Sequence, residues 1–129
     1  MYNPFASHIG LSISQAGDGA CRAELTAATE HLNPHDVVHG AVLFALADTA
    51  MGSALYSTLD RATEWCTTVE IKINYFRPAG PGLLVCDTQL VNRGRTMANL
   101  DSRITQNGKL VAAANGNFAI LARQPKPAP

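Results

Sequence analysis

The spacing of hydrophobic positions changes along the chain. Near the N-terminus, Ile9, Leu11 and Ile13 alternate with smaller or polar residues, a pattern typical of a short strand with one buried face. After the turn signal GDG at 17–19, the segment ACRAELTAA at 20–28 alternates again. The pattern predicts two strands separated by a turn.

An almost continuous apolar run follows. Residues 41–57 are rich in Ala and Leu, which are good helix formers, and Gly40 lies just ahead of them. Because the helix is apolar almost all round, we expect it to be buried rather than amphipathic. Asp48 is the one charged residue within the run.

After residue 61 the period becomes two. The Pro-rich segment RPAGPG at 77–82 ends the first strand of this region. Three more strands are predicted at 83–92, 96–106 and 109–121, joined by the turns NRGR and NGK. In the first strand, at 67–76, alternation predicts one face with Val69, Ile71, Ile73 and Tyr75 and another with Thr68, Glu70, Lys72 and Asn74.

The predicted order is two strands, one long buried helix and four strands in a meander. This indicates an α+β fold in which a curved antiparallel sheet wraps around one long central helix. Such an open sheet leaves edge strands, and dimerisation is one way to continue it.

Length and composition set further limits. The 129 residues suit a single domain, expected at 1–121, with a flexible Pro-rich tail at 122–129. A formal net charge of zero argues against nucleic acid or an anionic membrane as the main partner. No signal peptide is visible, so the cytoplasm is the expected location. The three widely spaced cysteines predict reduced, mostly buried thiols.

Asp48 is the first candidate for chemistry. Acids are usually exposed, so one interpretation is a carboxylate at the helix surface. Its neighbours one turn away are small or apolar and include no basic residue. Such surroundings also suit a carboxylate used in acid–base or nucleophilic catalysis. Gly40 is either a flexible joint or the source of an unshielded N–H for an oxyanion.

The loop before the helix offers several polar groups. His31, His35 and His39 recur every four residues, but Pro34 disfavours the helix that would bring them together on a metal, so no metal is expected. His39 is expected to orient the loop by hydrogen bonds. Asn33 is either a turn residue before proline or an amide donor to a substrate carbonyl.

Arg93 and Arg95 flank Gly94 in the segment NRGRT. One interpretation is a solvated hairpin turn, since turns favour such residues. The other is a clamp for phosphate groups, for which the guanidinium is well shaped.

Two segments together resemble a known family. HLNPHDVVHGAVLFALADTA at 31–50, followed by TTVEIKINYFRP at 67–78, is similar to hotdog-fold acyl-CoA thioesterases of the phenylacetate-degradation (PaaI-like) type. The shared pattern is an Asn, a VHG step six residues on, an apolar helix with LADTA and a strand ending in Y-x-R-P. The resemblance covers roughly residues 8–121. It implies a hotdog fold, a dimer or often a tetramer, and hydrolysis of a CoA thioester.

The resemblance also implies roles for single residues. Asp48 matches the catalytic carboxylate, and Gly40 matches the backbone donor of the oxyanion hole. Asn33 matches a residue that positions substrate and water, His39 the histidine that steadies the loop, and Thr68 a hydroxyl that orients water. No cofactor is needed.

Two positions depart from the family pattern. Ala41 stands where the family usually has a second glycine, which leaves the Gly40 N–H available. Asp36 stands where the loop usually has a glycine, and Asp tolerates left-handed conformations better than most residues. Its charge, close to the expected thioester, is a candidate influence on substrate choice.

Spacing adds an independent constraint. Gly40 and Asp48 are eight residues apart, or about 12 Å along one helix. A carboxylate and an oxyanion donor must both lie within about 3–4 Å of one reacting carbon. If both are catalytic, Gly40 of one subunit must face Asp48 of another, and the enzyme is at least a dimer.

The sequence therefore predicts a thioester hydrolase acting on an aryl or short- to medium-chain acyl-CoA. Asp48 either activates water or attacks directly. Arg93, Gly94 and Arg95 are expected to contact the CoA phosphates. Two alternatives are an enoyl-CoA hydratase or dehydratase that uses His35 with Asp48, and a non-catalytic acyl-CoA binding protein.

Overall fold

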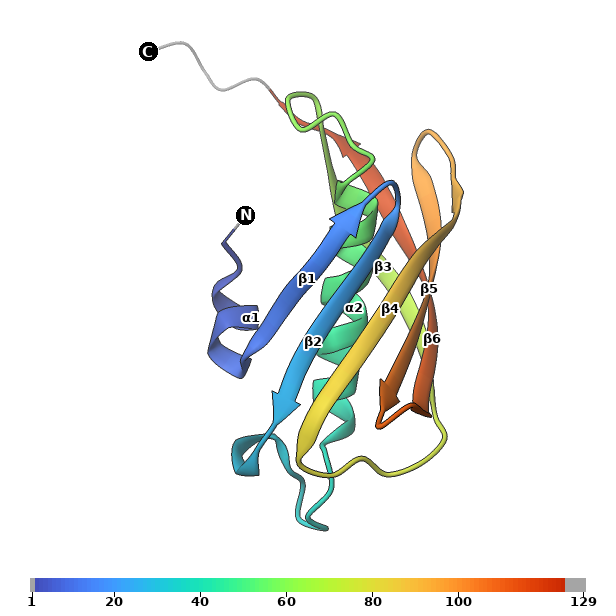
Figure 1. Cartoon of the computed structure of the whole chain (residues 1–129). Helices are drawn as coiled ribbons and strands as arrows, with labels where there is room; N and C mark the ends of the chain where they lie inside the picture. Colours follow the sequence, from blue (N-terminus) through green and yellow to red (C-terminus); the bar gives the residue numbers. More distant parts are fainter. Residues whose placement is uncertain (1, 125–129) are drawn as a thin grey trace.

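The computed structural model describes residues 2–124, so most of the predicted tail at 122–129 lies outside the described residues. One long helix lies against one face of an antiparallel sheet of six strands (Figure 1). No helix in the described range is long and apolar enough to cross a membrane. The elements in chain order are α1 (Pro4–Ile9), β1 (Leu11–Gly17), β2 (Ala20–Ala27), a 3-10 turn (Thr29–His31), α2 (Gly40–Tyr56), β3 (Glu64–Tyr75), β4 (Gly82–Arg93), β5 (Met97–Gln106) and β6 (Lys109–Ala122).

The strand order is β1-β2-β4-β5-β6-β3, so the predicted four-strand meander is wrong for one strand. β4, β5 and β6 follow one another as a meander, whereas β3 lies beyond β6 at the edge of the sheet. The connection 76–81 is too long and proline-rich for a tight hairpin, and it crosses one end of the sheet to reach β4 (Figure 1). β4 then pairs with β2, whose other neighbour is β1.

The prediction that α2 is enclosed holds on one side only. Its main contacts are with strands of the sheet, and Leu43, Leu46, Met51 and Leu55 are fully or almost fully buried there. The opposite side, which includes Ala41, Ala45, Asp48, Thr49 and Gly52, stays half-buried or exposed. The sheet therefore covers only part of an almost uniformly apolar helix.

A β-bulge in β3 changes which residues face the helix. Thr68 pairs with Phe118 and Glu70 with Asn117, so Val69 is the extra residue. Val69 is 57% exposed, whereas Thr68 lies against α2. The predicted alternation, which put Thr68 on the face opposite Ile71 and Ile73, is therefore wrong on the N-terminal side of the bulge. Bulges commonly redirect side chains in this way.

The short helix α1 was not predicted. Asn3 caps it by accepting a hydrogen bond from the Ala6 N–H at 3.0 Å, and Pro4 occupies its first turn. Asn followed by Pro is a helix-start signal, which makes the segment recognisable in retrospect. Gly10 ends the helix in a left-handed conformation.

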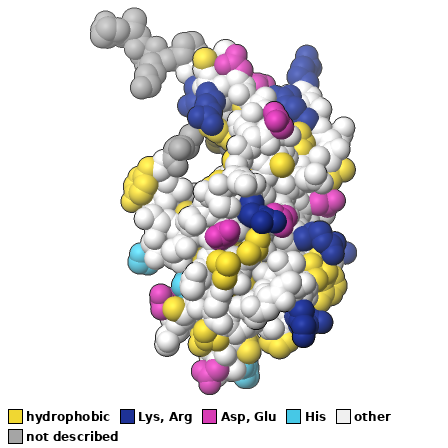
Figure 2. All heavy atoms as spheres, viewed as in Figure 1, with side chains coloured by type: hydrophobic (Ala, Val, Ile, Leu, Met, Phe, Trp, Pro, Cys, Tyr) yellow, Lys and Arg dark blue, Asp and Glu magenta, His cyan; other side chains and the backbone are white. Residues whose placement is uncertain are grey.

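The outer face of the sheet carries an ion pair and hydrogen-bonded amides. Basic and acidic side chains are interspersed over the face seen in Figure 2. Arg22 on β2 forms a bidentate ion pair with Asp87 on β4, with N–O distances of 2.7 and 3.0 Å. Asn99 and Asn115 exchange hydrogen bonds between β5 and β6. The apolar core lies between the other face and α2.

Gly116 on β6 lets the helix approach the sheet closely. A Cβ there would lie 2.7 Å from Met51 Sδ and 3.0 Å from Ile71 Cγ1. We therefore expect Gly116→Ala to lower the free energy of unfolding by about 1–3 kcal/mol through overpacking. Urea unfolding checks this, with Gly80→Ala as the control, because a Cβ at Gly80 meets nothing within 4 Å. Equal stability of the two variants would contradict the account of this contact.

Candidate active site

The first turn of α2 carries a free backbone donor. His39 caps the helix, and its Nδ1 accepts a hydrogen bond from the Ala41 N–H at 2.9 Å. The His39 N–H donates to His31 O at 2.9 Å, which ties the cap to the preceding turn. Among residues 2–124, no group accepts a hydrogen bond from the Gly40 N–H. This N–H lies at the positive end of the helix dipole, where an anionic oxygen is stabilised.

Tyr75 holds the same turn from the end of β3. Its hydroxyl donates to Gly40 O at 2.9 Å. A Cβ at Gly40 would lie 3.2 Å from both Cζ and Oη of Tyr75, so the absence of a side chain permits this approach. Burial raises the pKa of the Tyr75 hydroxyl, which keeps it a donor. Sequence reasoning placed Tyr75 on the same face of the strand as Ile71 and Ile73 but gave it no role.

The loop before α2 is folded around Asn33. Its Oδ1 accepts hydrogen bonds from the backbone N–H groups of His35 at 2.8 Å and Val37 at 3.4 Å. Two donors pointing at one atom fix it as the oxygen, so Nδ2 is the free end of the amide. No described residue accepts a hydrogen bond from Nδ2. The turn interpretation of Asn33 is confirmed, and its amide donor stays available.

Asp36 takes the left-handed conformation that the sequence suggested, with φ of 60°. The replacement of glycine by Asp therefore leaves the turn intact. The Asp36 side chain is exposed at the tip of the loop.

The carboxylate of Asp48 is paired with a hydroxyl. Thr68 Oγ1 donates a hydrogen bond to Asp48 Oδ1 at 2.6 Å. The bulge at Val69 produces this contact, because it turns Thr68 toward the helix. Asp48 is half-buried on the open side of α2. This hydrogen bond fixes the orientation of the carboxylate.

One chain does not bring these groups together. Gly40 and Asp48 lie on the same unbroken helix, Gly40–Tyr56. Eight residues correspond to about 12 Å along its axis. The Asp48–Thr68 pair and the Gly40 N–H therefore lie at different heights along α2.

The three histidines have separate surroundings. His31 is buried, and its ring bonds to the Ala28 N–H at 2.9 Å and to Ile9 O at 2.6 Å. His39 caps α2, and His35 is exposed. His31 thus ties the loop to the end of α1, a structural role that its spacing in the sequence did not indicate.

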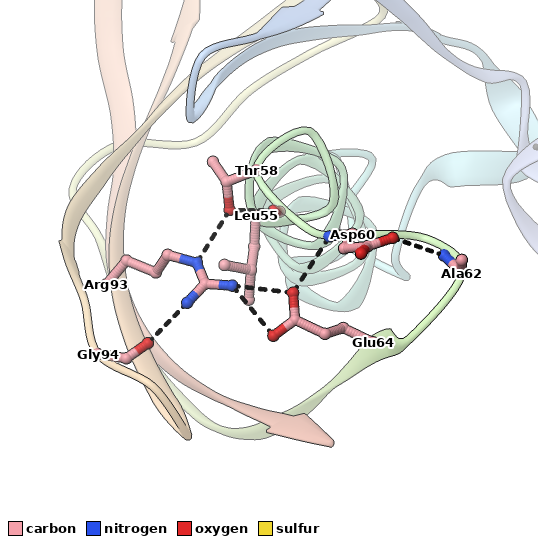
Figure 3. A network of polar contacts seen from close by, with 7 residues as sticks. All are labelled: Leu55, Thr58, Asp60, Ala62, Glu64, Arg93 and Gly94. Carbon is pink, nitrogen blue, oxygen red and sulfur yellow. Dashed lines mark hydrogen bonds and ion pairs between the residues drawn. The ribbon is translucent and has the colours of Figure 1, made fainter. Parts of the chain in front are cut away.

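The turn between β4 and β5 is anchored by Arg93. Its guanidinium forms an ion pair with Glu64 at 3.2 Å and donates to Gly94 O at 2.9 Å (Figure 3). It also donates to Thr58 Oγ1 at 3.4 Å, just past the end of α2. Arg95 is exposed. The two arginines therefore differ: Arg93 is occupied by structural contacts and Arg95 faces solvent.

The cysteines are unbonded, as the sequence predicted. Cys21 and Cys86 are buried, and burial raises the pKa of each thiol to about 11. Cys66 is half-buried and its pKa is also raised by burial. The thiols are therefore neutral near pH 7.

The chain is similar to known proteins both in sequence and in fold. The family model of the thioesterase superfamily matches residues 35–113. The Escherichia coli (strain K12) acyl-coenzyme A thioesterase PaaI is 32% identical over 114 residues, which cover 86% of this chain and 78% of that protein. A relative from Archaeoglobus fulgidus is 32% identical over 106 residues, which cover 81% of this chain and 66% of that protein.

Solved structures show the same architecture. A conserved protein of Pseudomonas aeruginosa superposes with a TM-score of 0.90 at 33% identity, covering 94% of this chain and 96% of that one. The phenylacetic acid degradation protein PaaI of Thermus thermophilus, in a mutant form, gives a TM-score of 0.84 at 28% identity, covering 91% of this chain and 98% of that one.

The long helix under one antiparallel sheet, with a carboxylate on its open side, thus corresponds to the hotdog fold of thioester hydrolases. This chain belongs to the thioesterase superfamily.

Proposed function

We propose that this protein is an acyl-CoA thioesterase that hydrolyses an aryl or short- to medium-chain acyl-CoA to the free acid and CoA. The observation that carries the proposal is the Asp48–Thr68 hydrogen bond of 2.6 Å on the open side of α2. The name of the E. coli relative, acyl-coenzyme A thioesterase, supports CoA as the carrier of the acyl group.

The water-activating half of the site is the pair itself. The Thr68 hydroxyl donates its hydrogen to Asp48 Oδ1. Its oxygen lone pairs therefore remain free to accept a hydrogen bond from a water molecule. Asp48 Oδ2 then takes the second proton of that water as the general base. The activated water attacks the thioester carbonyl, and the CoA thiolate leaves.

The oxyanion half lies at the start of α2. The Gly40 N–H stabilises the charge that develops on the carbonyl oxygen, and the helix dipole adds to it. Asn33 Nδ2 is the second donor to the same oxygen. His39 and Tyr75 position this half, because they bind the Ala41 N–H and the Gly40 carbonyl and leave the Gly40 N–H free.

A dimer unites the two halves. In the proposed assembly, two copies of α2 run antiparallel across a two-fold axis, so that Gly40 of one copy faces the partner's Asp48. The open side of α2 carries small residues, including Ala41 and Ala45, which allow close approach. The twelve-residue strand β3 pairs on one side only, with β6, which leaves a long edge for the partner's β3.

The turn 93–95 is proposed to contact the CoA phosphates. Arg95 is exposed and is available without rearrangement. Arg93 would exchange its ion pair with Glu64 for a phosphate contact. A pair of such dimers would give the tetramer that the family resemblance implies.

The role of the Asp48 carboxylate is tested by replacing it with an amide. Asp48→Asn keeps the shape but removes the base, so we expect kcat/KM to fall about 10²- to 10⁴-fold. Release of CoA thiol is followed with DTNB over acetyl-, hexanoyl-, phenylacetyl- and palmitoyl-CoA. Asp101→Asn, on the outer face of the sheet, is the matched control and is expected to keep activity within about twofold.

Full thioesterase activity in Asp48→Asn would contradict the proposed role of Asp48 as the general base. Hydration of an enoyl-CoA without thiol release would favour the hydratase, and binding measured by calorimetry without turnover would favour a binding protein.

The role of the Gly40 N–H as an oxyanion donor is tested by a proline substitution. Gly40→Pro removes the N–H, and Gly40→Ala retains it while crowding Tyr75 in the same way. His39 has φ −61° and ψ 134°, a conformation compatible with a following proline, and proline is favoured at the first position of a helix. We expect Gly40→Pro to lose about 10²- to 10³-fold in kcat relative to Gly40→Ala. Equal turnover by the two variants would remove Gly40 from the mechanism.

A further inference from the structure

Gly52 leaves a hollow on the open side of α2, one turn beyond Asp48. Residues four apart lie on the same side of a helix, so Gly52 follows the carboxylate toward the C-terminal end. A Cβ at this position would have one neighbour within 4 Å, Phe118 Cε2 at 3.9 Å, which is ordinary van der Waals contact. An alanine would therefore fit within the single chain.

The glycine is unfavourable for the helix itself. Gly in a helix interior is about 0.8–1.0 kcal/mol less favourable than Ala. Because the packing within the chain has room for a methyl group, that packing does not explain the glycine. The space above Gly52 is next to the catalytic pair and accessible from the open side.

An open surface cleft of about 710 Å³ lies beside the last turn of α2, lined in part by Tyr56, Trp65, Cys66 and Leu121. Tyr56 lies one turn beyond Gly52, and Cys66 lies two residues before Thr68 on β3. Since alternate strand residues share a face, Cys66 continues the surface that Thr68 begins. Asp48 and Tyr56 are eight residues apart, which gives a path of about 12 Å from the carboxylate to the cleft.

The far wall of the path is held in place. The guanidinium of Arg61 lies over the Tyr56 ring, 4.8 Å from its centroid, and Arg123 donates to the Tyr56 hydroxyl at 3.4 Å. Burial raises the pKa of the Cys66 thiol and keeps it neutral, so it acts as an apolar wall. The path therefore runs from the Asp48 carboxylate to the Tyr56 ring, which Arg61 and Arg123 hold in place.

The proposed dimer leaves this path open. If Gly40 faces the partner's Asp48, antiparallel register places Phe44 near the two-fold axis. Gly52 then lies opposite the partner's loop 33–39 rather than the partner's helix. The hollow is therefore enclosed by a loop that carries Asn33, the proposed donor to the carbonyl.

We propose that the acyl group of the substrate lies over Gly52 and extends toward Tyr56 and Cys66, so that Gly52 sets the size of the acyl group that is hydrolysed. The ligand class is an apolar acyl group, aryl or medium-chain, that is long enough to cover Gly52, about 6 Å beyond Asp48 along the helix. This inference rests on the proposed thioesterase function and adds the direction of the acyl group and the residue that limits it.

The test adds bulk at Gly52 and measures selectivity. Gly52→Ala and Gly52→Leu are compared with the wild type by kcat/KM for acetyl-, hexanoyl- and phenylacetyl-CoA. We expect the ratio of phenylacetyl- to acetyl-CoA to fall on the order of tenfold for Ala and further for Leu, because each added carbon occupies acyl space. Gly17→Ala, at an exposed position where a Cβ meets nothing within 4 Å, is the matched control and leaves the ratio unchanged.

The outcomes separate this inference from the function. Thermal unfolding should show Gly52→Ala at least as stable as the wild type, because alanine is the better helix former. Unchanged acyl selectivity in both Gly52 variants, with normal wild-type turnover, would overturn the role of Gly52 and leave the thioesterase intact. Failure of the wild type to hydrolyse any of the acyl-CoAs would reject the proposed function and this inference together.

Discussion

The arrangement depends on a helix that is apolar nearly all round but covered on one side only. The sheet buries the side that carries Leu46, Met51 and Leu55, and the close approach at Gly116 sets the distance between the two layers. The other side remains open and consists largely of small residues around Asp48. An exposed apolar side of this length is unfavourable in water, so the same constraint that leaves room for a site also favours a second copy of the chain.

Two local irregularities supply the polar groups of the proposed site. The bulge at Val69 shifts the phase of β3 and brings Thr68 within 2.6 Å of the Asp48 carboxylate. The cap by His39 takes up the Ala41 N–H and leaves the Gly40 N–H at the positive end of the helix. Neither feature adds to the hydrophobic core. Both direct a polar group toward the open side, where a thioester between two subunits would meet a base from one and a donor from the other.

Much of this was accessible from the sequence. The long apolar run predicted α2 within one residue at each end, and period-two alternation predicted all six strands. Asp48 stood out because a charge within an apolar helix is unusual. The place of β3 was missed because a chain-order pattern does not say which strand pairs with which. The orientation of Thr68 toward α2 was missed because a bulge breaks the period of two without a clear residue signature. Only the family resemblance assigned Thr68 a place in the site. Tyr75 was missed because its partner is a backbone carbonyl 35 residues away.

The central claim is that each site takes its base from one subunit and its oxyanion donor from the other. Mixing Gly40→Pro with Asp48→Asn, each nearly inactive alone, tests it most directly. After denaturation and refolding together, about half of the dimers contain one copy of each variant, and each of these has one intact site, so about a quarter of wild-type thioesterase activity should return. Activity no higher than the sum of the two separate variants, in a mixture shown to contain mixed dimers, would contradict the shared site.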